Sequence, residues 1–384
     1  MKKKIAISAL LFAVVGLWCQ CKQKYVSPYV SPNVGYLVVE GFISGNTPIK
    51  YTLSRTLPLP GDSTIPPEKG AEVEVEGNDN SIYRLIEQNP GVYSSPDTPG
   101  LDPQANYRLR IHTANGEDYL SDFVPFKPSP PIDSINWVGG PDGVTIFANT
   151  HDGTGSSRYY QWEFDETWQY NSAEYSYLTY DSTDSATAFR NLPADQIFTC
   201  WHELPSSTII LGNSLKLAQD VIYEQPLEQF PANSQKLAIR YTTLVHQWVL
   251  TDSAYNYASI MQKNTETLGS IFDAQPSGLA GNIHCLTKPG EQVVGYISAG
   301  TIQQQRIWIS VSQLPGWNYV FSCPEQDLII GGALVEYQDF YYGSLTPIIV
   351  TTPPAMPGVT ANQTFCVDCR AQGGKTYPPS YWTN

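Results

Sequence analysis

Seven cysteines are the most chemically versatile residues of this chain. Two of them follow an apolar N-terminal run, and the other five are Cys200, Cys285, Cys323, Cys366 and Cys369. The last two have the spacing of a redox C-x-x-C pair, but thioredoxin-like motifs begin a helix in a βαβ context that this sequence lacks. A zinc site would need a second pair of ligands. We therefore expect structural disulfides that tie the C-terminal tail to the body, with metal binding and redox chemistry as lesser alternatives.

The sequence gives little indication of a catalytic site. His202 and Glu203 lie beside Cys200 and could place a base near a thiol, but a nucleophile needs an oriented partner that the sequence does not reveal. The sequence contains no G-x-S-x-G, H-E-x-x-H, P-loop or Rossmann glycine pattern. A carboxylate pair of the glycoside-hydrolase kind stays open, because Asp and Glu are plentiful and their separation is invisible in a sequence. We predict no catalytic residue, no metal and no cofactor.

Aromatic side chains favour binding over catalysis. Residues 159–181 contain many Tyr and Trp side chains among polar ones. The first of them alternate in RYYQWEFD (158–165), as expected for a core strand. Four lie beyond that predicted strand and are candidates for an exposed platform for a sugar face or a protein partner: Trp168, Tyr170, Tyr175 and Tyr177. The alternative for these four is ordinary core packing.

The N-terminus predicts export and a lipid anchor. Lys2, Lys3 and Lys4 precede an apolar or small run from Ile5 to Leu17, too short for a transmembrane helix and typical of a cleaved signal. A cysteine stands where the cleavage site is expected, as in bacterial lipoproteins, whose cysteine becomes a diacylated N-terminus. We predict a signal peptide over residues 1–20 and lipidation of Cys21, with Cys19 as the alternative.

The lipid assignment decides how many thiols are free to pair. With Cys21 lipidated, five cysteines remain, which allow at most two disulfides and leave one thiol over. With Cys19 lipidated instead, Cys21 would make six. An exported protein meets an oxidising compartment, where disulfides persist.

Charge excludes one class of partner. The formal net charge is −14, and removal of the three signal lysines leaves 19 basic against 36 acidic side chains, or −17. Nucleic-acid grooves need a clustered basic surface, so we predict no nucleic-acid partner. With 41% hydrophobic residues the chain can bury a core and is not disordered.

Strand and turn patterns divide the chain into two β domains. Polar residues 21–34 are interpreted as a tether. Seven short strands with turn signals over residues 35–127 predict an Ig-like β-sandwich, in which Tyr107 suggests a tyrosine corner. Prolines at 128–134 indicate a linker. Residues 135–384 predict a larger, β-rich, sandwich-like domain with one notable helix, capped by Asp252 or Ser253 and ending near Gly269 or at the QPSG turn (275–278).

Several motifs together resemble a known family. They are LVVEGFIS, GAEVEV, GVYSS, PPIDSI, IFDAQPSGLAGNIHC, VVGYISAG and the ending CVDCRAQGG…PPSYW, in this order along the chain. In them the chain is similar to the Bacteroidota lipoproteins catalogued as domain of unknown function 4249. Members are encoded near TonB-dependent outer-membrane receptors, and no catalytic residues are established for them.

The resemblance and the lipid signal imply a function at the outer membrane. We expect a non-catalytic, lipid-anchored accessory of a TonB-dependent receptor, which assists nutrient uptake through ligand capture or protein contact. The alternative is an independent cell-surface glycan-binding or adhesion module. A secreted hydrolase with an unrecognised site ranks third.

Overall fold

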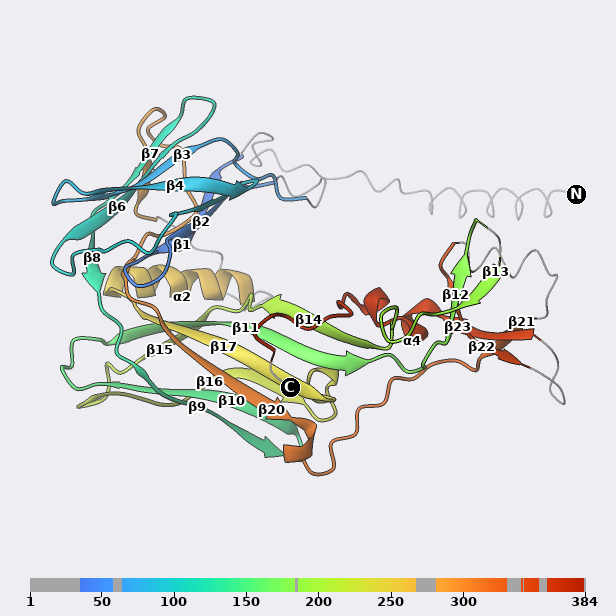
Figure 1. The fold of residues 1–384 in the computed structure, drawn as a ribbon. Helices are drawn as coiled ribbons and strands as arrows, with labels where there is room; N and C mark the ends of the chain where they lie inside the picture. Colours follow the sequence, from blue (N-terminus) through green and yellow to red (C-terminus); the bar gives the residue numbers. More distant parts are fainter. Residues whose placement is uncertain are drawn as a thin grey trace, which may run out of the picture.

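The computed structural model describes residues 35–57, 64–183, 186–266, 281–329, 340, 342–351 and 358–382. The chain is mainly β and builds an N-terminal unit, a second unit and a small distal lobe (Figure 1). Among the described residues no helix is long and apolar enough to span a membrane. The signal, both candidate lipid cysteines and the tether predicted over 21–34 lie outside the described residues.

Ten strands form the N-terminal unit. They are β1 (Leu37–Ser44), β2 (Lys50–Arg55), β3 (Glu72–Gly77), β4 (Ile82–Asn89), β5 (Val92–Ser94), β6 (Asn106–His112), β7 (Asp118–Ser121), β8 (Val124–Lys127), β18 (Ile283–Cys285) and β19 (Ala299–Gly300). The hydrogen-bonded order is β6-β3-β4-β5-β2-β1-β19-β8, and β8 pairs with β6 again. Eight strands therefore close into a ring, and β7 and β18 extend the sheet beyond β6.

This closure differs from the Ig-like sandwich predicted for residues 35–127. The predicted strands are present, but they do not separate into two independent sheets, because β19 is inserted between β1 and β8 and pairs in parallel with both. The tyrosine corner is confirmed: the buried Tyr107 donates from its hydroxyl to the carbonyl oxygen of Asp102 over 3.0 Å.

The closing strand comes from residues that the sequence assigned to the second domain. Segment 293–300 runs beside β1, with backbone bonds from Val39 to Val294 and from Ile43 to Ser298. Five side chains of this returning stretch belong to the N-terminal core: Ile283, Cys285, Val293, Ile297 and Ala299. The predicted domain 135–384 is therefore interrupted, since about 20 of its residues rejoin the first unit.

One end of the ring contains a charged cluster around Arg55. Its guanidinium contacts Glu68 at 2.5 Å, Glu117 at 3.1 Å and Glu291 at 3.6 Å, while its side chain is only 16% exposed. Lys288 also bonds to Glu117. Hydrogen bonds to this lysine, and then to neighbouring side chains that include Arg55, lower the pKa of Glu117 to about 2.

The second unit consists of two facing sheets. One contains β9 (Ile132–Gly140), β10 (Gly143–Asp152) and β16 (Asp220–Pro231); the other contains β11 (Tyr159–Asn171), β14 (Thr199–Pro205), β15 (Ile210–Asn213), β17 (Arg240–Val249) and β20 (Gln303–Ser310). Between them lies one continuous core that includes Ile146, Trp162, Phe230, Tyr241 and Ile309. Short 3₁₀ turns η1 (Gln235–Leu237) and η2 (Val311–Gln313) close its loops.

The distal lobe extends from the end of the second unit (Figure 1). It contains β12 (Leu178–Asp181), β13 (Ala186–Phe189), β21 (Asp327–Ile329), β22 (Leu345–Thr351), β23 (Gly358–Gln363), α4 (Thr364–Val367) and η3 (Cys369–Gln372). Its own small clusters of buried residues are centred on Ile348 with Cys366 and on Phe340 with Ala361.

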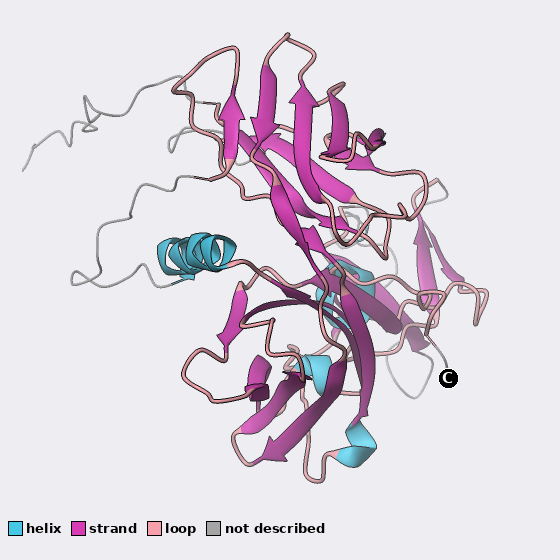
Figure 2. Ribbon diagram, turned by 90° about the vertical axis from the view of Figure 1, so that its left-hand side faces the viewer, coloured by secondary structure: helices cyan, strands magenta, loops and turns pink. Residues whose placement is uncertain are grey.

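Helix α2 (Asp252–Glu266) confirms the predicted helix, but its cap is Thr251, whose hydroxyl accepts from the amide of Ala254 over 3.2 Å, and Asp252 is already the first helical residue. The predicted helix ends lie outside the described residues. The helix stands to one side of the sheets (Figure 2). Its residue Ala254 belongs to an apolar cluster with Trp248 of the second unit and Phe42 of the first, so the helix lies where the two units meet. The rings of Phe42 and Trp248 are 5.7 Å apart.

Two segments of the chain run next to each other between the units. In the predicted linker 128–134, the Ser129 amide donates to Thr301 Oγ1 over 2.8 Å, and Pro130 accepts from the buried Gln247 amide over 3.0 Å. Asn46 of the first unit forms two bonds with the backbone of Ile302. The connection is thus held by hydrogen bonds from both units, in addition to the stiffness that its prolines suggested.

Replacing Arg55 by Met leaves three carboxylates without their shared cation. Removing one partner of a buried ion pair costs about 3–5 kcal/mol, so we expect the urea midpoint of unfolding to fall markedly. The matched control is Arg84→Met, since Arg84 also pairs with a glutamate, Glu74, but is 81% exposed; exposed pairs contribute about 0–1 kcal/mol. Equal effects of the two substitutions would contradict the role given to Arg55.

Acid should destabilise the protein partly through Glu117. Its folded pKa of about 2 lies below the unfolded value of roughly 4.3. Its stabilising contribution is therefore present above the unfolded pKa and is lost as the pH falls through the folded pKa. We expect Glu117→Gln to flatten the decline of the urea midpoint between about pH 5 and pH 2. Parallel declines in wild type and variant would refute this assignment.

Candidate functional site

Two of the four predicted platform residues are core residues, so that part of the prediction is wrong. Trp168 is 6% exposed and Tyr170 is 1% exposed. The reason is the length of β11: it continues to Asn171, six residues beyond the predicted strand end at Asp165. Its alternation therefore continues, and both side chains point into the second unit with Trp162 and Phe164.

Tyr175 and Tyr177 remain at the surface. Their side chains are 37% and 46% exposed, and their rings lie 5.0 Å apart. The ring of Tyr175 also contacts that of Phe198 at 5.2 Å. We call Tyr175, Tyr177 and Phe198 the tyrosine platform. Phe198 was missed by the sequence reasoning, because it precedes β14 with no periodic signal of its own.

Backbone and side-chain bonds to distant segments position the platform. Its segment leaves β11 and then bonds to the distal lobe: the Glu174 amide donates to the carbonyl of Cys366 over 3.1 Å, and the Tyr177 amide donates to Ile348 over 2.9 Å. Between them the buried Ser176 hydroxyl bonds to the carbonyl of Pro347 over 2.7 Å. The platform therefore depends on the lobe for its shape.

A cation lies at the edge of the platform. The Arg190 side chain donates to Ser176 over 3.1 Å, and its backbone amide donates to Tyr177 over 2.9 Å. Burial, followed by the nearby positive charge of Arg370, lowers the pKa of Arg190. Tyr and Arg are the residue types that dominate binding energy at protein interfaces. The arrangement suits docking of a partner against a preformed surface.

The five cysteines of the body form two disulfides and one free thiol. Cys200 bonds to Cys369, and Cys323 bonds to Cys366. The two cysteines of the C-x-x-C motif thus take different partners, so the motif is no dithiol pair. Cys285 is a free thiol buried in the N-terminal core. It was one of the candidate disulfide residues, so for Cys285 that prediction is wrong.

The first disulfide lies in the core of the second unit and joins β14 to the segment that begins the C-terminal tail. Lys375 exchanges backbone bonds with Trp201 and pairs with Glu203 at 3.0 Å. The ring of Trp382 lies 6.3 Å from that of Trp201 and 5.0 Å from that of Trp308. Because Cys200 is in this disulfide, it has no free thiol for His202 to activate, as the predicted base–thiol pair would require.

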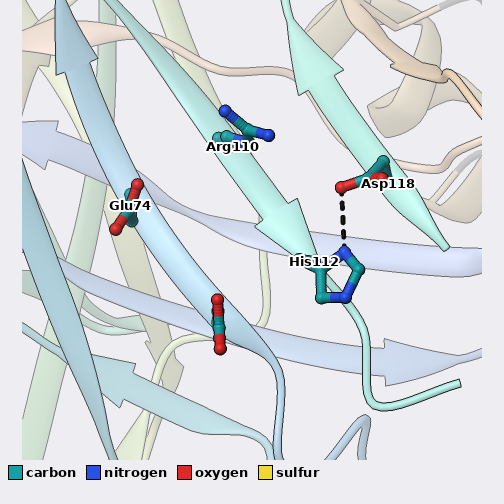
Figure 3. Close-up of a pocket in the computed structure, with 5 residues that line it drawn as sticks. Glu74, Arg110, His112 and Asp118 are labelled. Atoms are coloured by element: carbon teal, nitrogen blue, oxygen red, sulfur yellow. Dashed lines mark hydrogen bonds and ion pairs between the residues drawn. The ribbon is translucent and has the colours of Figure 1, made fainter. Parts of the chain in front are cut away.

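Charged side chains line a hollow of about 410 Å³ on the N-terminal unit. It is formed by Glu72 and Glu74 of β3, Arg110 and His112 of β6 and Asp118 of β7 (Figure 3). His112 Nδ1 lies 2.9 Å from a carboxylate oxygen of Asp118. Small-molecule pockets are mostly apolar, so this hollow is better described as a solvated sheet face with paired charges.

Histidines of the described chain mostly pair with aspartates. His112, His151, His246 and His284 each lie within 3.2 Å of an Asp carboxylate oxygen. His202 differs: it stacks on Trp168 at 4.5 Å, and burial lowers its pKa. Over the residues that the structure describes, no group of three or more His, Cys, Asp or Glu side chains is placed to hold a metal ion.

The fold and surface define a mainly β protein with a preformed aromatic surface on a disulfide-bonded lobe. Residues 24–306 match the model of a family described as Domain of unknown function (DUF4249). Because the match covers more than half of the chain, the protein belongs to this family. No curated protein matches the chain.

Loss of the lobe disulfide should loosen the platform. The double variant Cys323→Ser/Cys366→Ser frees the segment to which Glu174 bonds. We expect faster amide hydrogen exchange at residues 174–177 and a loss of about 2–4 kcal/mol of stability. The matched control is Cys200→Ser/Cys369→Ser, for which we expect faster exchange in the tail, around Lys375, instead. Identical exchange maps for the two variants would contradict this separation.

Proposed function

We propose that this protein is a non-catalytic, lipid-anchored outer-membrane lipoprotein that assists a TonB-dependent receptor in nutrient uptake through protein contact. The observation that supports docking is the exposed tyrosine platform on the distal lobe. The exposed parts of the Tyr175 and Tyr177 rings leave apolar area in water that a partner could cover. The anchor is proposed from the cysteine-ended signal, and the receptor from the resemblance in the sequence.

Neighbouring residues of the lobe extend the apolar surface. Phe189 of β13 is 77% exposed, and Ile349 and Val350 of β22 are 44% and 42% exposed. Phe189 is the register partner of Leu178, which directly follows Tyr177, and Ile349 follows the Ile348 to which Tyr177 bonds. Backbone neighbours of the platform therefore include exposed apolar side chains of two strands, which supports contact with a protein over contact with a small molecule.

Capture by crosslinking in intact cells tests this function. A photo-crosslinking amino acid at position 177 should yield an adduct with a TonB-dependent receptor, identified by mass spectrometry. The matched control is position 82, because Ile82 is also exposed but lies on β4 of the N-terminal unit. Tyr175→Ala/Tyr177→Ala should reduce receptor co-purification at least tenfold, since interface tyrosines often contribute about 2 kcal/mol each. Adducts without any receptor under nutrient limitation would overturn the proposal.

The second candidate is an independent glycan-binding or adhesion module. The exposed pair Tyr175 and Tyr177 supports it, because an aromatic face can stack on the apolar face of a sugar ring. Binding of the purified protein to a glycan array, lost in Tyr177→Ala and seen without any receptor, would favour this candidate over the first.

A further inference from the structure

In the turn from β15 into β16, the polar side chains of Ser214 and Asp220 are buried while two leucines are exposed, and Lys216 and Gln219 are exposed as well. Ser214 is fully buried and Asp220 is 2% exposed, whereas Leu215 and Leu217 are 55% and 53% exposed. The hydrophobic effect in water favours the opposite arrangement. We call residues 214–221 the inverted loop.

Hydrogen bonds hold the inverted loop in this arrangement. The Ser214 hydroxyl donates to Asp220 over 2.5 Å inside the loop. The Arg158 guanidinium donates to the carbonyl oxygens of Ser214 and Leu217, and the amide of Leu217 donates back to Ser214 over 2.9 Å. The leucines therefore cannot exchange places with the polar side chains without loss of this network.

More apolar and cationic groups surround the leucines. Val221, at the end of the loop, is 36% exposed, and Tyr223 on the adjoining part of β16 is 75% exposed. Lys216 lies between the two leucines in the sequence and is exposed, and the Arg158 guanidinium bonds to the backbone carbonyl of Leu217. Leucine with neighbouring Lys and Tyr is the combination that suits a membrane–water interface, where the apolar parts enter the acyl region and the polar ends stay at the headgroups.

We propose that the inverted loop inserts into the headgroup–acyl boundary of the bilayer that anchors the protein. This inference rests on the lipid anchor of the proposed function and adds a second membrane contact that sets the orientation of the body. The 14 residue steps from Cys21 to Gly35 reach at most about 50 Å when extended. The anchor thus keeps a bilayer surface within reach of the body, whereas no comparable concentration of another partner is imposed.

Fluorescence of the lipidated protein in vesicles tests the insertion. Leu217→Cys is labelled with the environment-sensitive fluorophore NBD and reconstituted by its own acyl chains into phosphatidylethanolamine–phosphatidylcholine vesicles. We expect a blue shift of the emission and quenching by nitroxide-labelled lipids. The matched control is Ile86→Cys, since Ile86 is also 53% exposed but lies on β4; it should show neither change. Native Cys285 is buried and should not react with the fluorophore, so wild-type protein treated in the same way gives the background signal.

The outcomes separate the two proposals. A protein that does not sediment with the vesicles after purification from its membrane refutes the anchor itself. A protein that sediments while position 217 stays unshifted and unquenched refutes only the insertion. Neither result depends on a receptor.

A second measurement uses the mature chain made without acyl groups. Leu215→Gln/Leu217→Gln should lower its partition into the same vesicles about tenfold for each leucine, and Ile86→Gln should leave it unchanged. Because these side chains are exposed, the variants should fold. If light scattering instead detects a dimer of the wild type that Leu215→Gln/Leu217→Gln abolishes, the loop contacts a second copy and the membrane assignment is wrong.

Discussion

The parallel pairing of β19 with β1 and β8 is the interaction on which the rest of the structure depends. It closes the ring of the N-terminal unit with residues that come later in the sequence than most of the second unit. Closing so long a loop has an entropic cost, which burial of Ile297, Ala299 and their neighbours in the shared core offsets. Since the chain enters the second unit twice, after β8 and again after β19, through adjacent connections, the closure also determines how the two units are joined.

Polar side chains at the junction between the units are satisfied by hydrogen bonds. Gln247 is fully buried, yet it donates to Pro130 and Thr150 and accepts from the Trp162 indole, so its amide is satisfied. An unsatisfied buried amide would instead favour opening. Asn46 of the first unit also bonds to Ile302. Few groups at the junction would therefore gain hydrogen bonds if the two units separated. Surfaces on the two units are therefore presented in a defined relation, which suits a protein whose proposed role is contact.

Two surface features, the tyrosine platform and the inverted loop, are held in shape by a disulfide and by buried hydrogen bonds. The tyrosine platform is shaped by bonds to a lobe that Cys323–Cys366 closes. The inverted loop is maintained by Ser214, Asp220 and Arg158. In both, buried polar contacts keep apolar side chains in water, and this cost is acceptable where a partner surface covers them. The aspartate-paired histidines and the charged hollow of Figure 3, in contrast, are satisfied by their own neighbours.

Local chemistry in the sequence determined much of this architecture. Alternation in residues 71–77 predicted β3, helical spacing of apolar residues predicted α2, and Tyr107 predicted the corner, because each signal is carried by residues that are close together in the sequence. The cap of α2 was assigned wrongly, since Thr251 and not Asp252 or Ser253 bonds to the free amide of Ala254. The cysteine count limited the body to two disulfides and one thiol, as found. Tyr175 and Tyr177 were recognised as candidate surface residues, while Trp168 and Tyr170 were not recognised as core residues.

Only the tertiary structure decided the rest. Whether Trp168 is buried depends on how far β11 is paired with β14 and β17, and those partners lie 30 or more residues away along the chain. Ring closure by β19, the choice of disulfide partners and the outward leucines of the inverted loop likewise depend on segments distant in the sequence. Periodicity reports which face of an element is apolar, but burial is a property of what packs against that face, and the packing partner is set by the whole fold.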